Sequence, residues 1–307
     1  YTLSGGTHQF TINLRPLNAT LARQYDGTAT SAGSTLSSFD ALQGGETLTM
    51  SGSGTAASVN VANGIAMSSN GDLGLVDGTG LASNYSLNST VINITQRVLN
   101  SSGSKIYDAN TNALAADITL SNLVSGETLN HSGTATLSSA NAGSYTISNL
   151  TGISIADNAG LASNYTLTGG THNFTVNPKV VSIQGNKTYD GNTTISSSDI
   201  TSITGTVGSE TLVMSSGTGT TSSQNAATYT SAGINEGSLT LGDGSNGGLA
   251  ANYTLTGHAA SSFQINQRVL SSSGTRTYDG TATASSSDLT SVSYTHLRAH
   301  ETREALV

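Results

Sequence analysis

Three aspartates in glycine-rich stretches are the first candidates for metal chemistry. Asp77, Asp157 and Asp243 each precede such a stretch, and carboxylate oxygens are ligands that calcium prefers. Calcium needs about six oxygen ligands, however, and the residues around each aspartate supply fewer. A lone aspartate in a glycine turn usually accepts hydrogen bonds from backbone N–H groups instead. We therefore predict backbone caps, with no metal site and no cofactor.

Three histidines are also predicted to be structural. His8 and His172 lie 164 residues apart, twice a spacing of 82 that recurs along the chain, and each precedes an alternating strand pattern. His131 takes the place that Met50 and Met214 occupy in related stretches, which indicates a partly buried packing position. Single histidines on different repeats cannot converge on one metal ion.

No catalytic constellation is recognisable in the sequence. It shows no nucleophile elbow, zinc-binding helix, phosphate-cradling loop or carboxylate pair with a fixed partner. The net charge of −8 argues against nucleic acid and anionic membranes as partners, since both require clustered Lys and Arg. No apolar run of about 18 residues is present, so we expect no membrane insertion. We predict that the protein is not an enzyme.

A Tyr-Asp-Gly marker organises the chain. It occurs four times, once with alanine in place of glycine, at spacings of 82, 82 and 89 residues. A second marker, Asn-Tyr, recurs with a similar period. The marker residues are Tyr25, Asp26, Gly27, Tyr107, Asp108, Tyr189, Asp190, Gly191, Tyr278, Asp279 and Gly280 for the first, and Asn84, Tyr85, Asn164, Tyr165, Asn252 and Tyr253 for the second.

Two further features share this period. A Glu-Thr-Leu marker begins at Glu46, Glu127 and Glu210, downstream of a Tyr-Asp pair each time. Eight of the ten Lys and Arg residues form pairs whose members are 8 residues apart. Any role of these charges must be common to all repeats, which disfavours a unique active site. The pairs are Arg15 and Arg23, Arg97 and Lys105, Lys179 and Lys187, and Arg268 and Arg276.

The apolar pattern predicts an all-β fold. Segments 10–14, 174–177 and 263–266 alternate apolar and polar residues, and clusters of Gly, Asn, Asp and Ser between such segments are typical of turns. A period of 82–89 residues is too long for one coil of a β-helix. It suits about seven strands with their turns, so we predict a tandem array of Ig-like β-sandwich repeats.

The Tyr-Asp-Gly marker itself predicts a tight turn at the end of a strand. Glycine accepts a positive φ, and the aspartate carboxylate bonds to its own backbone. The tyrosine ring should pack on the sandwich, covered by the stem of the basic residue two positions earlier. The copy with Ala109 should turn differently, with Asn110 in the left-handed conformation.

These periods divide the chain into repeats. We assign residues 1–14 to the end of a preceding repeat, 15–96 to repeat 1, 97–178 to repeat 2, 179–267 to repeat 3 and 268–291 to a truncated repeat 4. Almost no spacer separates the last strand of one repeat from the first strand of the next, so neighbouring repeats are each other's predicted partners in a stiff string. Residues 268–291 are not expected to fold alone.

The last sixteen residues follow none of these patterns. Residues 292–302 resemble the in-frame translation of a sequencing-library adaptor, and we interpret 292–307 as a non-native tail whose histidines and glutamates have no function. The alternative is a genuine terminal helix, which would leave repeat 4 cut off after 24 residues.

Three stretches carry a resemblance to a known family: KTYDGNTT (187–194), RTYDGTAT (276–283) and GLASNYTLTG (160–169). They resemble the YDG-type repeats of filamentous-haemagglutinin-like exoproteins and related adhesins of Gram-negative bacteria. The resemblance covers residues 1–291 and implies Ig-like sandwiches, secretion, and display at the bacterial cell surface or outer membrane. It implies a repeat class and no particular ligand.

Two functions remain open at this point. The repeats could be a structural stalk or spacer that holds a distal part of an adhesin away from the cell. Alternatively, they could bind a host glycan or surface protein weakly, with affinity multiplied by repetition. The second function requires tyrosines exposed in equivalent places on successive repeats, whereas buried tyrosines favour the stalk.

Overall fold

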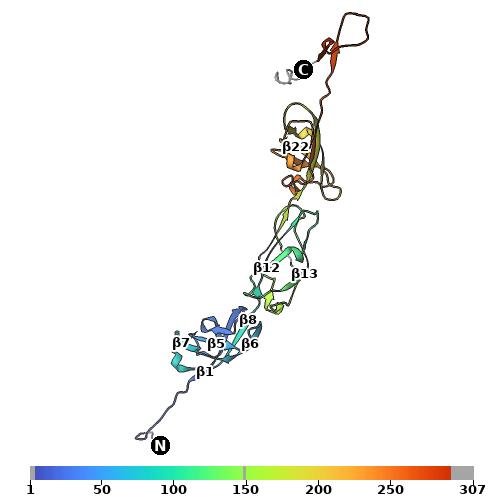
Figure 1. Ribbon diagram of the computed structural model, residues 1–307. Helices are drawn as coiled ribbons and strands as arrows, with labels where there is room; N and C mark the ends of the chain where they lie inside the picture. Colours follow the sequence, from blue (N-terminus) through green and yellow to red (C-terminus); the bar gives the residue numbers. More distant parts are fainter. Residues whose placement is uncertain (1–3, 148–149, 292–307) are drawn as a thin grey trace. The chain divides into compact units, whose positions relative to one another are not determined.

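The computed structural model describes residues 4–147 and 150–291, and there it is an all-β repeat array, as predicted (Figure 1). Contacts divide the chain into two compact units. One comprises residues up to 103 with 112–137 and 145–174, and the other comprises 104–111, 138–144 and the residues from 175 onward. No helix within the described residues is long and apolar enough to span a membrane.

The strands follow the predicted repeats in order. Repeat 1 contains β1 (Arg15–Gln24), β2 (Thr30–Ala32), β3 (Leu36–Phe39), β4 (Leu48–Ser51), β5 (Ser53–Ala56), β6 (Ala62–Ser69), β7 (Gly74–Asp77) and β8 (Tyr85–Thr95). Repeat 2 contains β9 (Arg97–Val98), β10 (Asn100–Ile106), β11 (Asn112–Leu114), β12 (Ile118–Ser121), β13 (Asn130–Thr136), β14 (Gly143–Thr146), β15 (Ile153–Ala156), β16 (Tyr165–Thr166) and β17 (His172–Asn177).

Repeat 3 and the residues after it complete the series. Repeat 3 contains β18 (Lys179–Val180), β19 (Ser182–Thr188), β20 (Thr194–Ser196), β21 (Ile200–Thr204), β22 (Leu212–Ser216), β23 (Thr218–Thr221), β24 (Thr228–Thr230), β25 (Ile234–Asn235), β26 (Thr240–Asp243), β27 (Tyr253–Thr254) and β28 (Ser262–Asn266), followed by β29 (Ser272–Gly274) and β30 (Leu289–Ser291). Short 3-10 turns lie at η1 (Gly33–Thr35), η2 (Ala82–Asn84), η3 (Ala115–Asp117), η4 (Ala162–Asn164), η5 (Ser197–Asp199), η6 (Ser231–Gly233), η7 (Ala250–Asn252) and η8 (Ser286–Asp288).

Each repeat is built around a parallel pair of its first and last long strands. In repeat 1, β1 pairs with β8 within the six-stranded sheet β2-β5-β6-β8-β1-β3, and the fully buried Leu21 lies opposite the fully buried Ile92. In repeat 3, β19 pairs with β28 in the sheet β21-β19-β28-β24. Because these two strands run in the same direction, the chain enters a repeat at one end of the pair and leaves it at the other.

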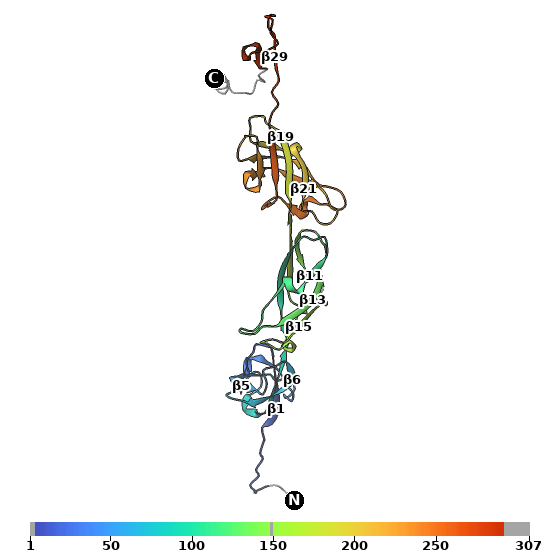
Figure 2. The same ribbon diagram turned by 45° about the vertical axis from the view of Figure 1, so that its right-hand side comes forward.

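Repeats 2 and 3 divide their longer strands between two sheets. Repeat 2 has the four-stranded sheet β12-β10-β17-β14 and the three-stranded sheet β11-β13-β15, which Figure 2 labels. Repeat 3 has corresponding four-stranded and three-stranded sheets, the latter being β20-β23-β25. These two sheets hold seven strands in each repeat, and further strands lie in the two-stranded sheets β16-β9 of repeat 2 and β18-β27 and β22-β26 of repeat 3.

A phenylalanine packed over a glycine anchors the core of these two repeats. Phe174 and Phe263 on the last strands are 1% and 0% exposed. A Cβ added at Gly103 would lie 2.7 Å from the Phe174 ring, and one at Gly185 would lie 3.0 Å from the Phe263 ring. Glycine is required at both positions because a Cβ would also lie 2.4 Å from a backbone carbonyl oxygen, that of Asp117 or Asp199, so neither side leaves room for a side chain.

One residue separates the last strand of a repeat from the first strand of the next. β8 ends at Thr95 before β9 begins at Arg97, and β17 ends at Asn177 before β18 begins at Lys179. Strand pairing then sets the first basic residue of each repeat opposite the tyrosine of its Asn-Tyr marker. The paired residues are Arg15 with Tyr85, Arg97 with Tyr165, and Lys179 with Tyr253.

The segments outside repeats 1–3 are less structured. The strand predicted over 10–14 is wrong: β1 begins at Arg15, and Phe10 and Ile12 are 90% and 83% exposed. The equivalent strands β17 and β28 pair with the first strand of their own repeat, and the described residues hold no such partner for 10–14. Residues 268–291 form one antiparallel strand pair. The predicted non-native tail lies outside the described residues.

Loss of the Phe263 ring should destabilise repeat 3 selectively. We expect Phe263→Ala to cost about 3–5 kcal/mol because it removes a fully buried aromatic and leaves a cavity. Val213→Ala is the matched control, since Val213 is 51% exposed and truncation there should cost less than about 0.5 kcal/mol. Hydrogen exchange of repeat 3 peptides measures both, and equal effects would contradict this account of the core.

Candidate functional site

The Tyr-Asp-Gly marker forms a turn that a buried base holds closed. In repeat 3, Lys187 Nζ donates to Asp190 Oδ1 at 3.0 Å and to the carbonyl oxygens of Asn192 and Thr194 at 2.9 and 2.7 Å. The Lys187 side chain is only 7% exposed, so its charge needs these partners. Arg23 with Asp26, Lys105 with Asp108, and Arg276 with Asp279 form the same ion pair.

Each aspartate of this turn also accepts a backbone N–H two residues later. The bonds to Asp108 and Asp190 measure 3.2 and 3.1 Å. Burial raises the pKa of both carboxyls, but the hydrogen bonds from the lysines and from these N–H groups outweigh it, and each pKa lies below its usual value. The carboxylates therefore stay ionised as structural partners of the bases.

The alanine copy of the turn differs from its prediction. Ala109 itself adopts the left-handed conformation, with φ of 62°, close to the 77° of Gly27. Asn110 was expected there instead, and that prediction is wrong. The side chain of Asn110 helps to hold the turn, because its Oδ1 accepts from Lys105 Nζ at 2.9 Å and its Nδ2 donates to Asp108 at 2.7 Å. These bonds offset the strain of a left-handed alanine.

The tyrosine of the turn reaches into the next repeat. Tyr25 is 3% exposed and lies in one buried cluster with residues of repeat 1 and with Leu129 and Tyr165 of repeat 2. Its hydroxyl donates to Glu127 Oε1 at 2.5 Å, while the hydroxyl of Tyr165 donates to Glu127 Oε2 at 2.5 Å. The two rings meet edge to face, with centroids 5.5 Å apart.

The same arrangement recurs one repeat later. Tyr107 of repeat 2 donates to Glu210 Oε1 at 2.8 Å, and Tyr253 of repeat 3 donates to Glu210 Oε2 at 2.6 Å. The rings of Tyr107 and Tyr253 are 5.4 Å apart, again edge to face. We call each set of two tyrosines and one glutamate a tyrosine-carboxylate junction. All three sequence markers therefore meet at one place.

A buried asparagine completes each junction. Asn164 is 1% exposed, and its Oδ1 accepts from the backbone N–H of Val61 at 2.9 Å while its Nδ2 donates to Asn60 at 3.0 Å. Asn252 bonds in the same way to Ala142 and Asn141, at 2.8 and 3.1 Å. The roles of Asn60 and Asn141 were not foreseen, although these asparagines are 81 residues apart, one fewer than the spacing of the Tyr-Asp markers.

Burial sets the acidity of the junction tyrosines. Burial first, and then the hydrogen bond to the glutamate, raises the pKa of Tyr107, Tyr165 and Tyr253 to about 12. A phenolate beside a carboxylate would place two negative charges in contact, so each hydroxyl keeps its proton. Each junction consists of two neutral tyrosine hydroxyls that donate to one glutamate carboxylate. This arrangement holds neighbouring repeats together and is not suited to proton transfer.

The tyrosine markers outside these two junctions are only partly engaged. In repeat 1, the Tyr85 hydroxyl donates to Glu46 and accepts from the Gln43 N–H at 3.1 Å, while Asn84 is exposed. Tyr189 is half-buried, and its hydroxyl has no partner within residues 4–147 and 150–291. Tyr278 in the truncated repeat is 89% exposed.

The three aspartates considered as calcium ligands cap backbone groups, as the sequence predicts. Asp77, Asp157 and Asp243 accept the N–H groups of Ala82, Ala162 and Ala250 at 2.6, 2.7 and 2.7 Å. These alanines begin η2, η4 and η7, the turns that lead into the Asn-Tyr markers. Within the described residues, no group of three or more acidic or histidine side chains could hold a metal ion.

The histidines make structural contacts. His172 is buried and bonds to Ser101 Oγ at 3.0 Å and to the carbonyl of Leu167 at 2.8 Å. His131 lies near the carbonyls of Ala115 and Ile118, at 3.0 and 2.9 Å, in a partly buried position as predicted. His8 is exposed.

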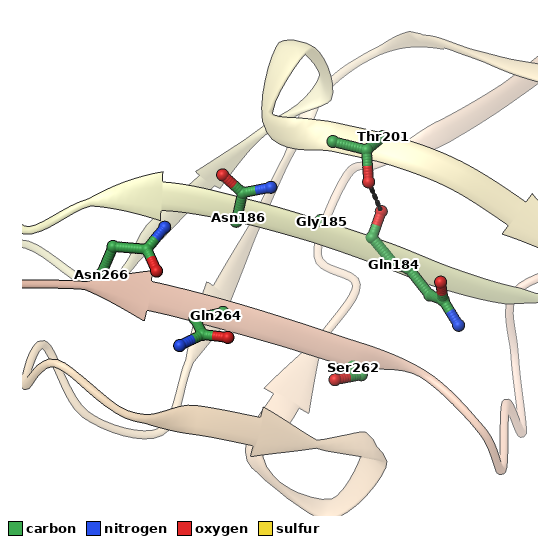
Figure 3. A pocket seen from close by; sticks show the side chains of 7 residues that line it. All are labelled: Gln184, Gly185, Asn186, Thr201, Ser262, Gln264 and Asn266. Carbon is green, nitrogen blue, oxygen red and sulfur yellow. Dashed lines mark hydrogen bonds between the residues drawn. The ribbon is translucent and has the colours of Figure 1, made fainter.

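An open polar hollow lies on the β19 and β28 face of repeat 3 (Figure 3). Its lining residues are Gln184, Gly185, Asn186, Thr201, Ser262, Gln264 and Asn266. None of them titrates or is a nucleophile activated by a neighbouring base, so the hollow offers hydrogen bonds and no catalytic group. Repeat 2 places the smaller Ser102 and Ser104 at the positions equivalent to Gln184 and Asn186.

A family model described as YDG domain matches three segments of the chain, residues 11–92, 93–173 and 171–262. The matched copies begin four to eight residues before the repeats as divided above. No curated protein and no solved structure matches the chain.

Removing one junction hydroxyl should weaken the coupling between repeats 2 and 3. We expect Tyr107→Phe to cost about 1–2 kcal/mol, because the ring stays packed but the Glu210 carboxylate loses one of its two donors. Urea unfolding of the full chain measures the loss. Tyr189→Phe is the matched control at the same turn position, and a loss there as large as at Tyr107 would contradict the assignment.

Alkaline pH should open the junctions. The folded pKa of about 12 for Tyr107, Tyr165 and Tyr253 lies above the ordinary value of 10, so folding retains these protons. Stability should be full below pH 10 and fall as pH rises from 10 to 12. Urea midpoints measured with phenolate absorbance test this, and a midpoint that stays constant through pH 12 would be inconsistent with buried, protonated tyrosines.

Proposed function

Since the chain belongs to the YDG domain family, with three copies in tandem, we propose that its repeats are the non-catalytic stalk or spacer of a secreted or surface-displayed bacterial adhesin. The observation that carries the proposal is the convergence of the sequence markers on the junctions. At both boundaries between repeats 1–3, the recurring tyrosines, glutamate and asparagine join the two neighbouring repeats. When the recurring side chains bind the neighbouring repeat, the array is suited to holding a distal domain at a fixed distance and orientation.

The short connections support the same function. A single residue, Gln96 or Pro178, links consecutive repeats, and the junction contacts bind the ends of the strands on either side of it. A connection this short with a hydrogen-bonded contact beside it resists bending more than a flexible linker does. A spacer requires this resistance to bending.

Direct ligand binding has less support. Tyr25, Tyr85, Tyr107, Tyr165 and Tyr253 are all 6% exposed or less, so these markers cannot stack on a sugar. Among the described residues, no tyrosine is exposed in equivalent places on successive repeats. The polar hollow of repeat 3 lacks an aromatic residue and is not repeated with the same side chains in repeat 2. Avidity through repetition would need an aromatic contact residue and the same binding side chains in each repeat.

Interprobe distances in the full chain test the stalk. The chain has no cysteine, so Thr119→Cys and Ser202→Cys place two spin labels on exposed positions of repeats 2 and 3 without background. We expect one narrow distance distribution that broadens in the Tyr107→Ala variant, because the 2–3 junction loses its aromatic contact. Tyr189→Ala should leave the distribution unchanged. A broad distribution in the unaltered chain would refute a rigid spacer.

Dense display on beads separates the stalk from the binding function. Beads carrying the full chain should show no saturable binding to host cells, glycans or matrix proteins, compared with beads carrying an unrelated β-protein. Saturable binding that soluble chain competes away would instead make the repeats adhesive themselves.

A further inference from the structure

Two of the four Tyr-Asp turns place a lysine amine against an asparagine carboxamide. In repeat 2, Lys105 Nζ donates to Asn110 Oδ1 at 2.9 Å, and in repeat 3, Lys187 Nζ donates to Asn192 Oδ1 at 2.9 Å. The Cγ atom of each carboxamide lies one bond beyond Oδ1, so it is at most about 4.1 Å from Nζ. The last torsion of an asparagine side chain turns freely enough to present the carbonyl face to the amine. An amine and a carboxamide held this close can condense to a secondary amide.

The residue types at these turns vary together. Both lysines are followed five residues later by asparagine, whereas the two arginine turns, at Arg23 and Arg276, have threonine at that position. A guanidinium stays protonated in proteins and is a poor nucleophile, and a threonine has no carboxamide to be attacked. The two groups that can react with each other are therefore either both present in a turn or both absent from it.

The fold holds both amines in place. The side chains of Lys105 and Lys187 are 8% and 7% exposed, and each Nζ also donates to the backbone carbonyl of its asparagine, at 2.8 and 2.9 Å. Only a neutral amine attacks, and a free lysine is neutral in about one molecule in 2,500 at pH 7. Fixed proximity can be equivalent to a reactant concentration of about 10⁵–10⁸ M, which offsets this scarcity. The bond also needs to form only once in each molecule, so a slow reaction suffices.

The aspartate of the turn is placed to move the proton. In repeat 2, Asp108 Oδ1 accepts from Lys105 Nζ at 2.8 Å, and Asp108 Oδ2 accepts from Asn110 Nδ2 at 2.7 Å. One oxygen therefore faces the attacking nitrogen and the other faces the nitrogen that must leave. In repeat 3, both oxygens of Asp190 accept from Lys187 Nζ, at 3.0 and 3.3 Å. A carboxylate in this position can act as base for the amine and then as acid for the departing group.

We propose that Lys105 and Asn110, and likewise Lys187 and Asn192, join in intramolecular isopeptide bonds. The neutral Nζ attacks Cγ and forms a C–N bond while the aspartate accepts one proton from Nζ. The tetrahedral intermediate then breaks its Cγ–Nδ2 bond, and the aspartate gives the proton to Nδ2, which leaves as ammonia. One C–N bond forms and one breaks, nothing is oxidised or reduced, and the aspartate ends as it began. The reaction therefore needs no cofactor or co-reactant.

The bonds close the turns that carry the first tyrosine marker. Tyr107, whose hydroxyl donates to Glu210, lies within the ring that the bond between residues 105 and 110 closes. Tyr189 lies within the equivalent ring of repeat 3. A turn closed by a covalent bond keeps its tyrosine in position even when its hydrogen bonds open. This adds to the proposed spacer without depending on it: interprobe distances test the spacer and the mass of the chain tests the bonds, so either can fail alone.

Mass spectrometry of the unfolded full chain tests the proposal. Each bond releases one ammonia of about 17 Da, so the measured mass should lie about 34 Da below the mass calculated from the sequence. Trypsin requires a charged lysine, which the new amide removes, so digestion should leave the chain uncut after Lys105 and Lys187. It should still cleave after Arg23, the matched position of repeat 1. Fragmentation of the uncut peptides should show Lys105 joined to Asn110 and Lys187 joined to Asn192.

Variants of repeat 2 assign the reacting groups. Asn110→Ala removes the carboxamide, and Asp108→Asn removes the base while leaving both reactants. Each should halve the mass deficit to about 17 Da relative to its own calculated mass and restore cleavage after Lys105. Asn112→Ala, at the next asparagine along the chain, is the matched control and should keep the full deficit.

The proposal is overturned if the unaltered chain has its calculated mass or if trypsin cleaves after both lysines. Hydrogen bonds alone, without a covalent link, give that result. A loss of ammonia that maps to a succinimide at an Asn-Gly pair such as Asn246 and Gly247, with both lysines cleaved, also overturns it. A link in only one repeat overturns the proposal for the other turn.

Discussion

A carboxylate shared by two tyrosine hydroxyls from neighbouring repeats is the contact on which the rest of this protein depends. Glu127 and Glu210 each accept one hydroxyl from the preceding repeat and one from their own. A half-buried anion is stable there only because both of its oxygens are satisfied by strong donors. Each hydroxyl in turn stays protonated because burial, and then the neighbouring carboxylate, raises its pKa. The two repeats therefore share one set of hydrogen bonds across their boundary.

The parallel pairing of first and last strands explains why the markers meet. It sets the first basic residue of a repeat opposite the tyrosine of its Asn-Tyr marker, at the end where the repeat begins. The second basic residue lies eight positions along the first strand, at the other end, where it closes the Tyr-Asp turn. The start of the first strand therefore lies beside the tyrosine that binds the preceding repeat. Its end leads into the Tyr-Asp turn that binds the following repeat. Repeats built in this way can be joined in series.

Much of this could be predicted from the sequence, and the missing part has a physical reason. The alternating segments and the period predict the all-β repeat array, and the lone aspartates predict backbone caps, because both depend on local periodicity and turn chemistry. The markers were recognised as recurring, but their meeting was not predicted, because Tyr25 and Glu127 are 102 residues apart and belong to different repeats. A sequence period shows which residues are equivalent in successive repeats. It does not show whether such a residue contacts its own repeat or the neighbouring one. Ala109 was misjudged because Asn110 supports the turn through its side chain and not through its backbone.

The greater length of repeat 3 shows that the junctions tolerate longer loops. Repeat 3 is 89 residues long, and five of its seven extra residues relative to repeat 2 fall between Glu210 and Tyr253. Asp243 still caps Ala250 at 2.7 Å across a span two residues longer than in the other repeats, and Tyr253 still reaches Glu210 at 2.6 Å. Loops can therefore lengthen without disturbing a junction, since the entropy of closing a loop grows slowly with its length. With only 9% charged residues in the chain, the exposed surface is covered mainly by Ser, Thr, Asn and Gly, and the specific contacts between repeats are concentrated at the repeat ends.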